Sequence, residues 1–444
     1  MSLALVLLQA LAATTAAEAD AVASLPGLAT LPTAMFAGLL PTTPSADESS
    51  LFYWLCEANE DAHAKPLVLW LQGGPGASSL FSLFTETGPL RMNGELHDPP
   101  SVANVSWSLG KGSVNMLYID QPLGTGFSAV TNESQYARSE GELAATVVAA
   151  LRVFVERHPR YAHREFFLFG ESFAGHMAPN VAASLSIAMP PVPLKLTGLA
   201  IGDGWVEPIA QNAAFVPYAK ATGLIGERDA AWLTTRAEQC AVLLKAGRTV
   251  EAFKTACYYQ LLNPIIDIAG GDVSPYDIRN YADTTDAPCD LDPLCTYLGR
   301  EDVRTALHVP SSHPGWGTQS AGVEKALVAD LNANTSLPLW PALLAGGVRV
   351  LVYNGNFDLI CNALGTSNYL MKQWPALLEV NRTVWRSATT NITAGWKLQH
   401  PNLALTQVVV ANAGHLAPKD QPENMRELAL NFVAGATSLQ PLED

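Results

Sequence analysis

Short apolar runs bounded by glycine, proline or asparagine recur along the chain and alternate with helical patterns. Uninterrupted apolar runs of this length are typical of parallel strands that are buried on both faces of a sheet. Between the second and third runs, leucine, valine and phenylalanine recur at helical spacing from Glu140 to Arg157, which predicts an amphipathic helix ending before Pro159. The predicted strands are Pro66–Leu71, Val114–Ile119, Glu165–Phe169, Leu196–Ile201, Val348–Tyr353 and Thr406–Val410.

This alternation predicts an α/β fold with a central, mostly parallel sheet and helices on both faces. From about Val206 to about Trp316 the strand-like apolar runs stop, and the sequence is helix-like and contains cysteines. Ligands of open α/β sheets bind beyond the carboxyl ends of the strands, so an insertion leaving near Ile201 would roof that crevice. We therefore expect one large domain, residues 18–205 and 317–444, with a largely helical cap insertion at 206–316.

Composition supports a substantial buried core, since 48% of the 444 residues are hydrophobic and only 15% are charged. The net charge of −15 argues against nucleic acid or an anionic membrane as a partner, because either requires a basic face. No apolar stretch reaches the ~20 residues that span a bilayer. The cysteines lack metal-type spacing and no cofactor motif stands out, so we expect neither a metal nor a cofactor.

The amino terminus has the pattern of a secretory signal peptide, which we place at residues 1–17. An apolar run from Leu3 to Ala13 precedes small residues, although a basic segment before it is missing. We expect the secretory pathway, with secretion or delivery to a lysosome or vacuole. Five N-x-[ST] sites then become candidate glycosylation sites: Asn104, Asn132, Asn334, Asn381 and Asn391.

Six cysteines would meet an oxidising environment there. The four in the middle of the chain can close local loops, so we predict disulfides Cys240–Cys257 and Cys289–Cys295. Cys56 directly follows the strand-like stretch 52–55 and is predicted to be a free thiol. The same prediction holds for Cys361, which follows a candidate catalytic aspartate. Six cysteines allow 15 pairings, so other connectivities remain open.

The strongest chemical signal is a buried strand that runs directly into Gly170-Glu171-Ser172-Phe173-Ala174, followed by a helical pattern. At such a sharp turn the residues two before and two after the serine must be small, because backbone segments approach closely. The turn would hold the hydroxyl of Ser172 in the crevice, where it could act as a nucleophile. The alternative interpretation is an exposed turn serine.

A serine hydroxyl needs a base to activate it and an acid to orient that base. Among the nine histidines, His415 alone follows a predicted strand at its carboxyl end. Asp358 also follows a strand and precedes His415, in the chain order nucleophile, acid, histidine. His176 is expected to pack near the serine without a catalytic role. Asp120 and Asp203 end strands on the wrong side of that order, and Asp120 is expected to be a structural hydrogen-bond acceptor.

Acyl transfer also requires donors for a developing oxyanion. The backbone N–H of Phe173, after the nucleophile, is one candidate, and a loop after an early strand usually supplies the other. That loop is Gln72-Gly73-Gly74-Pro75-Gly76, within which we choose Gly74. A phosphate-binding loop is the alternative, but the lysine and serine or threonine of a P-loop are missing.

With these residues identified, the chain resembles the serine carboxypeptidase family of the α/β-hydrolase fold over nearly its whole length. The resemblance rests on motifs that occur in family order, and its Gln72 and Gly124-Thr125-Gly126 look most like the vitellogenic carboxypeptidase-like subgroup. It implies release of C-terminal amino acids through an acyl-enzyme at acidic pH, with peptide or protein C-termini as substrates. A homodimer is compatible with it. The motifs are Leu69–Gly76, Tyr118–Ser128, Gly170–His176, Ile201–Gly204 and Gly414-His415.

The resemblance further implies that Gln72, the Gly73 N–H, Glu86 and Glu171 bind the carboxylate of the substrate. Two glutamates in contact cannot both ionise cheaply, so the pair would hold a proton that it can donate to an anionic chain end. Gln72 stands where most members have asparagine, and the family disulfide involving position 77 is missing. Three other functions remain open: an acyltransferase on the same scaffold, a partner-stabilising protein with secondary catalysis, and a general esterase or lipase.

Overall fold

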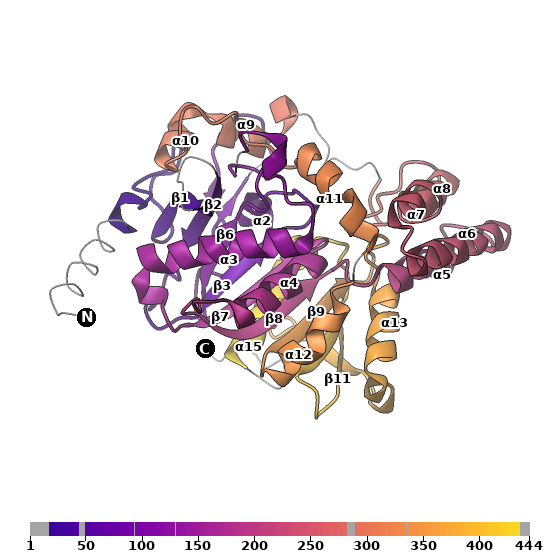
Figure 1. Ribbon diagram of the computed structural model, residues 1–444. Helices are drawn as coiled ribbons and strands as arrows, with labels where there is room; N and C mark the ends of the chain where they lie inside the picture. The colour runs from indigo at the N-terminus through magenta and orange to yellow at the C-terminus, as the bar shows by residue number, and fades with distance from the viewer. Residues whose placement is uncertain are drawn as a thin grey trace.

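The computed structural model describes residues 17–43, 49–92, 94–128, 130–281, 289–333 and 335–435. The predicted signal peptide therefore lies almost entirely outside the described residues. A ten-stranded sheet forms the centre of the molecule, in the order β1-β2-β6-β3-β7-β8-β9-β12-β11-β10 (Figure 1). Its strands are β1 (Met35–Pro41), β2 (Ser50–Cys56), β3 (Leu67–Leu71), β6 (Asn115–Ile119), β7 (Glu165–Glu171), β8 (Lys195–Gly202), β9 (Arg349–Gly355), β10 (Thr383–Arg386), β11 (Thr393–Gln399) and β12 (Leu405–Val410), and a separate pair comprises β4 (Leu90–Arg91) and β5 (Ser101–Val102).

The six predicted strands are the six central ones, from β6 to β12, and all of them pair in parallel. Their ends differ from the predicted ends by at most two residues. The predicted α/β class is therefore confirmed. Four antiparallel strands flank this centre, β1 and β2 on one side and β11 and β10 on the other. Their sequences did not predict them as strands, apart from the strand-like stretch within β2.

Alternate strand residues point into two separate hydrophobic clusters, one on each face of the sheet. In β3, for example, Leu67, Leu69 and Leu71 belong to one cluster and Val68 and Trp70 to the other. Both faces are thus buried, which explains why these strands read as continuous apolar runs. The first face is covered by α3 (Glu140–Arg157), α4 (Ala174–Ile187), α12 (Trp340–Ala345) and α13 (Ala363–Gln373), and the second by α2 (Ser79–Thr85), α9 (Pro293–Gly299), α10 (Glu301–Ala306), α14 (Ala417–Asp420) and α15 (Pro422–Ala434).

The predicted insertion at 206–316 contains two groups of helices. The first group projects to one side of the sheet (Figure 1) and adds a small cluster around Cys240 and Cys257. The second group, α9 and α10, packs instead with the second face of the sheet, near β1 and β2. The boundaries 206 and 316 stay a prediction. The projecting helices are α5 (Pro208–Ala221), α6 (Glu227–Lys245), α7 (Thr249–Thr255) and α8 (Tyr259–Ile268), and α11 (Ala321–Ala333) follows the insertion.

Candidate active site

Ser172 occupies the turn between β7 and α4, where its φ angle of 61° lies in the left-handed region. The turn is held by the Ser172 N–H, which donates to Gly202 O at 3.0 Å, and by Trp205 N–H, which donates to Ser172 O at 2.8 Å. A Cβ at Gly170 would lie 2.8 Å from the Ala174 Cβ, so the two small residues around the serine are sterically required. This is the strained strand-turn-helix geometry that exposes a nucleophilic serine.

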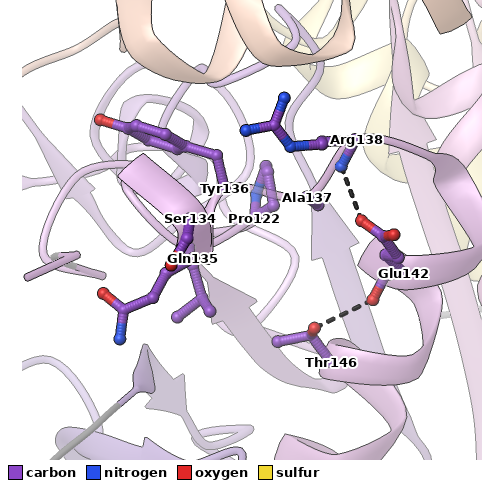
Figure 2. A pocket seen from close by; sticks show the side chains of 9 residues that line it. Pro122, Ser134, Gln135, Tyr136, Ala137, Arg138, Glu142 and Thr146 are labelled. Carbon is purple, nitrogen blue, oxygen red and sulfur yellow. Dashed lines mark hydrogen bonds between the residues drawn. The ribbon is translucent and has the colours of Figure 1, made fainter. Parts of the chain in front are cut away.

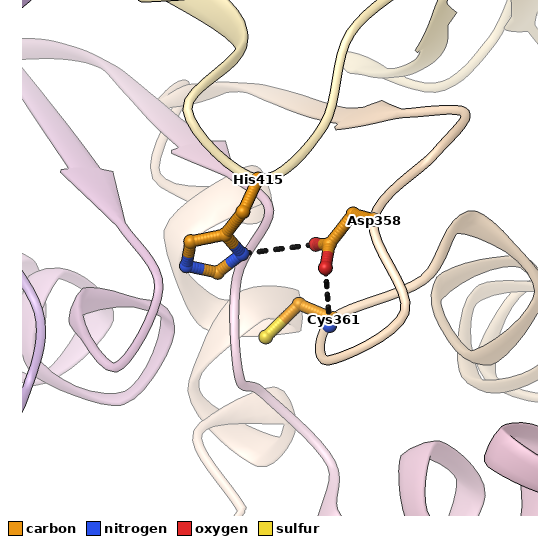
Figure 3. A group of neighbouring side chains, drawn as sticks. All are labelled: Asp358, Cys361 and His415. Carbon is orange, nitrogen blue, oxygen red and sulfur yellow. Dashed lines mark hydrogen bonds and ion pairs between the residues drawn. The ribbon is translucent and has the colours of Figure 1, made fainter. Parts of the chain in front are cut away.

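His415 and Asp358 form a buried couple at the ends of β12 and β9 (Figure 3). His415 Nδ1 lies 3.0 Å from Asp358 Oδ2, and the two side chains are 3% and 0% exposed. The other carboxylate oxygen, Asp358 Oδ1, accepts from Cys361 N–H at 3.1 Å. Bonds from two donors fix the carboxylate, which in turn orients the imidazole. Atoms of Asp358, Cys361 and His415 that could bind a metal ion lie within 4.8 Å of one another. The hydrogen bonds from His415 and Cys361 to Asp358 account for this closeness.

Residues of the predicted insertion hold the loop that carries His415, which the sequence did not indicate. The Tyr276 carbonyl accepts from His415 N–H at 2.7 Å, and the two rings meet edge to face at 5.2 Å. A Cβ at Gly414 would lie 2.6 Å from the Asp277 Cβ, so only glycine fits beside this segment. Arg279 pairs with Asp277 at 2.6 Å and also donates to the carbonyl of Asn412 at 2.9 Å. The loop from β12 is therefore held by residues distant in sequence.

The glycine-rich loop after β3 lies directly against the nucleophile. A Cβ at Gly73 would be 2.5 Å from Phe173 N and 2.7 Å from the Ser172 Cβ. Gly74 has a φ angle of 102°, and a Cβ there would lie 2.6 Å from Ala77 N. Phe173 is the N-cap of α4, where helix amides have no carbonyl partner within the helix. Both predicted oxyanion donors thus belong to segments that meet at Ser172.

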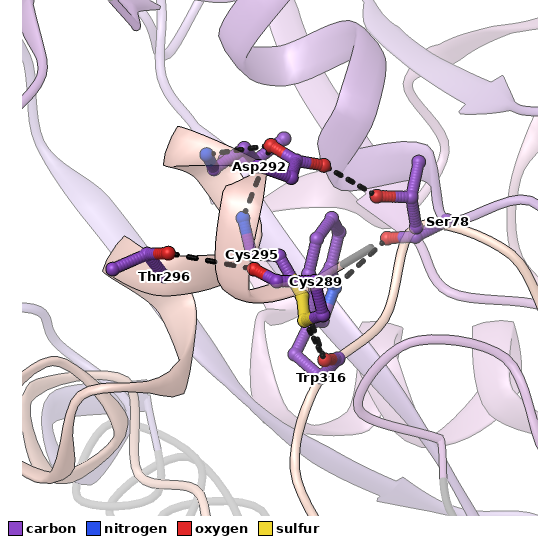
Figure 4. The surroundings of a disulfide bond; sticks show 8 residues. Ser78, Cys289, Asp292, Cys295, Thr296 and Trp316 are labelled. Carbon is purple, nitrogen blue, oxygen red and sulfur yellow. Dashed lines mark hydrogen bonds between the residues drawn. A yellow bond between two sulfur atoms is a disulfide. The ribbon is translucent and has the colours of Figure 1, made fainter. Parts of the chain in front are cut away.

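Residues near the Cys289–Cys295 disulfide support the glycine-rich loop (Figure 4). Trp316 Nε1 donates to Ser78 Oγ at 3.1 Å, and the Ser78 N–H donates to Thr318 O at 2.9 Å. Thr318 Oγ1 in turn donates to Asp292, the N-cap of α9, at 3.1 Å. Ser78 also donates to Asp120, which behaves as the structural acceptor that the sequence predicted.

Glu171, immediately before the nucleophile, is completely buried with Glu86 and Gln72. Gln72 Nε2 donates to Glu171 Oε1 at 2.7 Å and Gln72 Oε1 accepts from Trp70 Nε1 at 2.8 Å, which fixes the amide orientation. Burial, together with the contact with Glu86, raises the pKa of Glu171 well above its usual range. Burial raises the pKa of Glu86 to about 7, against the opposing effects of its hydrogen bond with Glu171 and nearby positive charges.

Electrostatic interactions connect the glutamate pair with Asp358 and His415. The charge of His415 acts on Glu86, and the charge of Asp358 acts on Glu171. Ser172 is the next residue after Glu171, so the structure gathers the three predicted triad residues and the glutamate pair at one edge of the sheet. Parallel strands bring this about, because the carboxyl ends of β7, β9 and β12 share that edge.

His176 lies outside the catalytic couple, as the sequence predicted. Its ring stacks on Phe173 at 5.3 Å and its Nδ1 lies 3.1 Å from Glu140 Oε1. The N–H of Glu140 donates to Asp330 on α11 at 2.9 Å. His176 thus belongs to a buried cluster that joins three helices.

Two disulfides link the cysteines as the sequence predicted, Cys240 with Cys257 and Cys289 with Cys295. Cys56 and Cys361 are buried free thiols. Of the candidate glycosylation sites, Asn334 lies outside the described residues. The other four, Asn104, Asn132, Asn381 and Asn391, are exposed.

A separate pocket lies where the loop after β6 meets the start of α3 (Figure 2). Its lining contains none of the triad, oxyanion or glutamate residues. Glu142, one of its polar residues, accepts from Arg138 N–H at 2.8 Å, and its carbonyl accepts from Thr146 at 2.9 Å. Within the described residues, no helix is both long and apolar enough to cross a bilayer.

One buried acid beside the triad escaped the sequence prediction. Asp203 lies directly after β8. Its exclusion by chain order was wrong, because Asp203 follows Ser172 and precedes His415. The structure buries it completely, next to Asp358. The available signal was an aspartate directly after a strand, in a Gly-Asp-Gly turn, at a place in the chain that fits the order nucleophile, acid, histidine.

Comparison with known proteins identifies relatives over almost the entire chain. A family model described as serine carboxypeptidase, peptidase S10, matches residues 26–435. Serine carboxypeptidase S10 family member 2 of Dictyostelium discoideum is 32% identical over 435 residues, covering 93% of this chain and 75% of the relative. Venom serine carboxypeptidase of Apis mellifera is 33% identical over 414 residues, covering 89% and 84%. The crystal structure of Kex1(delta)p, a prohormone-processing carboxypeptidase from Saccharomyces cerevisiae, matches with a TM-score of 0.80 at 25% identity, covering 94% of this chain and 96% of that one.

Fold and site together define a hydrolase of the α/β-hydrolase fold with a serine at the nucleophile elbow. Within that class, the chain belongs to the serine carboxypeptidase family. It is a serine-type carboxypeptidase, an enzyme that removes residues from the C-terminal end of peptides. The predicted family is thereby confirmed, and the vitellogenic-like subgroup stays a prediction.

Proposed function

We propose that Ser172, His415 and Asp358 form the catalytic triad that cleaves the last peptide bond. His415 takes the proton of the Ser172 hydroxyl as Oγ attacks the scissile carbonyl, and then gives that proton to the leaving amino acid. The acyl-enzyme that results is hydrolysed by water, with His415 again serving as base and then acid. Asp358 accepts from His415 Nδ1 throughout and stabilises the imidazolium.

The tetrahedral intermediate carries an oxyanion, which the N–H groups of Gly74 and Phe173 would stabilise. A single donor of this kind contributes about 3 to 4 kcal/mol to transition-state stabilisation. The close approach of Gly73 to Ser172 supports this role, because it brings the backbone amides of this loop next to the nucleophile.

The observation that carries the exopeptidase proposal is the buried carboxyl pair beside the nucleophile. Glu86 and Glu171 are 2% and 0% exposed, and neither has a cationic partner among the described residues within ion-pair distance. Two acids in contact hold a proton, and a neutral acid can donate to the C-terminal carboxylate of a peptide. Gln72 and the Gly73 N–H would complete that recognition. An endopeptidase site would have no use for such a pair.

The shared proton also supports an acidic working range. Above a pH of about 7, Glu86 ionises and the pair gains a negative charge that repels the substrate carboxylate. Affinity for peptides with a free C-terminus would therefore weaken as the pH rises.

The decisive experiment compares the parent enzyme with Ser172→Ala on a set of blocked dipeptides at pH 5. Parent enzyme should release the C-terminal amino acid, and the variant should lose release by at least about 10⁴-fold. The same peptides with a C-terminal amide are the matched control and should be poor substrates of the parent. Equal turnover of acid and amide, or an active Ser172→Ala, would contradict the proposal.

We also propose that the protein matures in the secretory pathway. Two disulfides and four exposed N-x-[ST] sites support this location. Protein expressed in a eukaryotic secretory host should lose mass on treatment with an endoglycosidase. An unchanged mass would count against this location.

A further inference from the structure

Asp203 is tied to β9, the strand that leads to the catalytic aspartate. Its N–H donates to the Tyr353 carbonyl at 2.8 Å, and its Oδ1 accepts from the Gly355 N–H at 2.8 Å. Gly355 is also the acceptor of the Asp358 N–H, at 3.5 Å. Asp203 and Asp358 are each 0% exposed. The position of the Asp203 carboxyl is thus coupled to the turn that carries Asp358.

The other carboxyl oxygen of Asp203, Oδ2, indicates where the proton of this group lies. Asp203 Oδ2 is buried and has no donor partner among the described residues. Burial, and after it the charge of Asp358, raises the pKa of Asp203, so the two fully buried carboxyl groups are electrostatic neighbours. Two oxygens of neighbouring carboxyl groups attract each other only when a proton lies between them. An ionised Asp203 would leave a buried charge next to another of the same sign.

The proton belongs on Asp203 because the two acids have different partners. Asp358 accepts from His415 Nδ1 and from Cys361 N–H, two bonds that favour its ionised form. Asp203 accepts from one backbone N–H only. Burial, reinforced by the charges of Asp358 and Glu171, raises the pKa of Asp203 well above its usual range. Tyr218, Tyr353 and Cys361 also interact with the charge of Asp203, and burial raises the pKa of each.

We propose that Asp203, as a neutral carboxylic acid, donates its Oδ2 hydrogen to Asp358 and is a positioning residue of the triad. The donated bond adds a third support to the carboxylate, besides those from His415 and Cys361. It holds the plane of the carboxylate toward the imidazole, and it does so without placing a second negative charge behind the triad. This inference rests on the proposed triad and goes beyond it by giving the triad a fourth member.

Asparagine is the matched substitution, because its amide reproduces both bonds of a neutral aspartic acid. Oδ1 would still accept from Gly355, and Nδ2 would donate to Asp358. Asp203 has a φ angle of 44°, which asparagine and glycine tolerate better than alanine. Asp203→Gly therefore removes the donor without adding backbone strain. Asp203→Asn and Asp203→Gly together separate hydrogen-bond donation from charge.

The test measures kcat and KM for a blocked dipeptide from pH 4 to 7 in the parent and both variants, with folding checked by circular dichroism. Asp203→Asn should keep kcat within about threefold of the parent and leave the acidic limb of the kcat/KM profile in place. Asp203→Gly should lower kcat by roughly 10- to 100-fold at unchanged KM, the size expected for one hydrogen bond to a charged group.

Three outcomes would overturn the proposal. One is a shift of the acidic limb in Asp203→Asn, since removing a real negative charge would change the protonation of the neighbouring couple. Another is a loss in Asp203→Asn as large as in Asp203→Gly, and the third is a fully active Asp203→Gly. If Asp203→Gly does not fold, the Asp203→Asn profile alone decides between a neutral and an ionised Asp203. The activity of Ser172→Ala tests the proposed triad itself. An active Ser172→Ala would refute the triad whatever the two Asp203 variants show.

Discussion

The shared proton of Glu86 and Glu171 makes a quantitative prediction about substrate binding. Ser172→Ala is the suitable host, because it binds substrate without turning it over and its dissociation constant is free of kinetic contributions. The pKa of Glu86 is about 7, raised from 4.5 chiefly by burial. If binding requires the protonated pair, the dissociation constant scales with one plus the ionised-to-protonated ratio of Glu86.

That relation predicts weakening of about tenfold between pH 6 and pH 8, which is about 1.4 kcal/mol. Binding of a blocked dipeptide should be measured by calorimetry across this range in Ser172→Ala. Adding Glu86→Gln removes the titrating group, so the dissociation constant should change less than about threefold over the same range. Glu171→Gln should blunt the pH dependence as well, because no proton then needs to be shared.

The control ligand is the same dipeptide with a C-terminal amide, which lacks the charge that the pair recognises. Its binding should be weak and should not follow the titration of Glu86. The reasoning fails if the double variant with Glu86→Gln weakens tenfold between pH 6 and pH 8, as the host does. It also fails if the amide shows the same pH dependence as the acid.

Three further outcomes are expected. Gly73→Ala should lower kcat by at least about 100-fold, because the new Cβ would lie 2.5 Å from the backbone nitrogen of Phe173, a proposed oxyanion donor. The control is Gly299→Ala, whose Cβ would have no atom within 4 Å and which should keep the parental kcat. Replacing both Cys240 and Cys257 by serine should lower the free energy of unfolding by about 3 kcal/mol in urea titrations, since the bridge spans a sequence separation of 17; an unchanged midpoint would contradict this. Burial raises the pKa of Glu86 from 4.5 to about 7, so the neutral side chain stabilises the folded protein fully below pH 4.5 and this contribution is lost as the pH rises through about 7. The loss in the free energy of unfolding is about 3 kcal/mol. Glu86→Gln should therefore lose less stability than the parent between pH 5 and pH 8 in urea titrations.

The sequence was most informative where one local pattern determines one element. The central strands are buried on both faces, so each appears as an apolar run, and their ends could be placed to within two residues. The elbow around Ser172 combines small residues at fixed spacing with a preceding strand. Asp358 and His415 could be proposed because strand ends in a parallel sheet share one edge.

The flanking strands were missed because their patterns are mixed. β10 has one buried residue in four, and β11 mixes buried and half-buried positions without a regular alternation. Such strands pair antiparallel at the borders of the sheet, where one face or edge remains in contact with solvent. Their place depends on the strand next to them and not on their own composition.

Local sequence therefore determined the fold class, the six central strands and three residues that can form a triad. Tertiary structure alone decided which charges face one another. Glu86 and Glu171 come from different elements, as do Asp203 and Asp358, and each pair meets only because the helices and strands pack in this register. The physical reason is that periodicity records how a residue is buried, whereas protonation depends on the distance to groups elsewhere in the chain. For that reason the place of Asp203 beside Asp358 became visible only in the folded protein, whereas the glutamate pair was expected from the resemblance to the family.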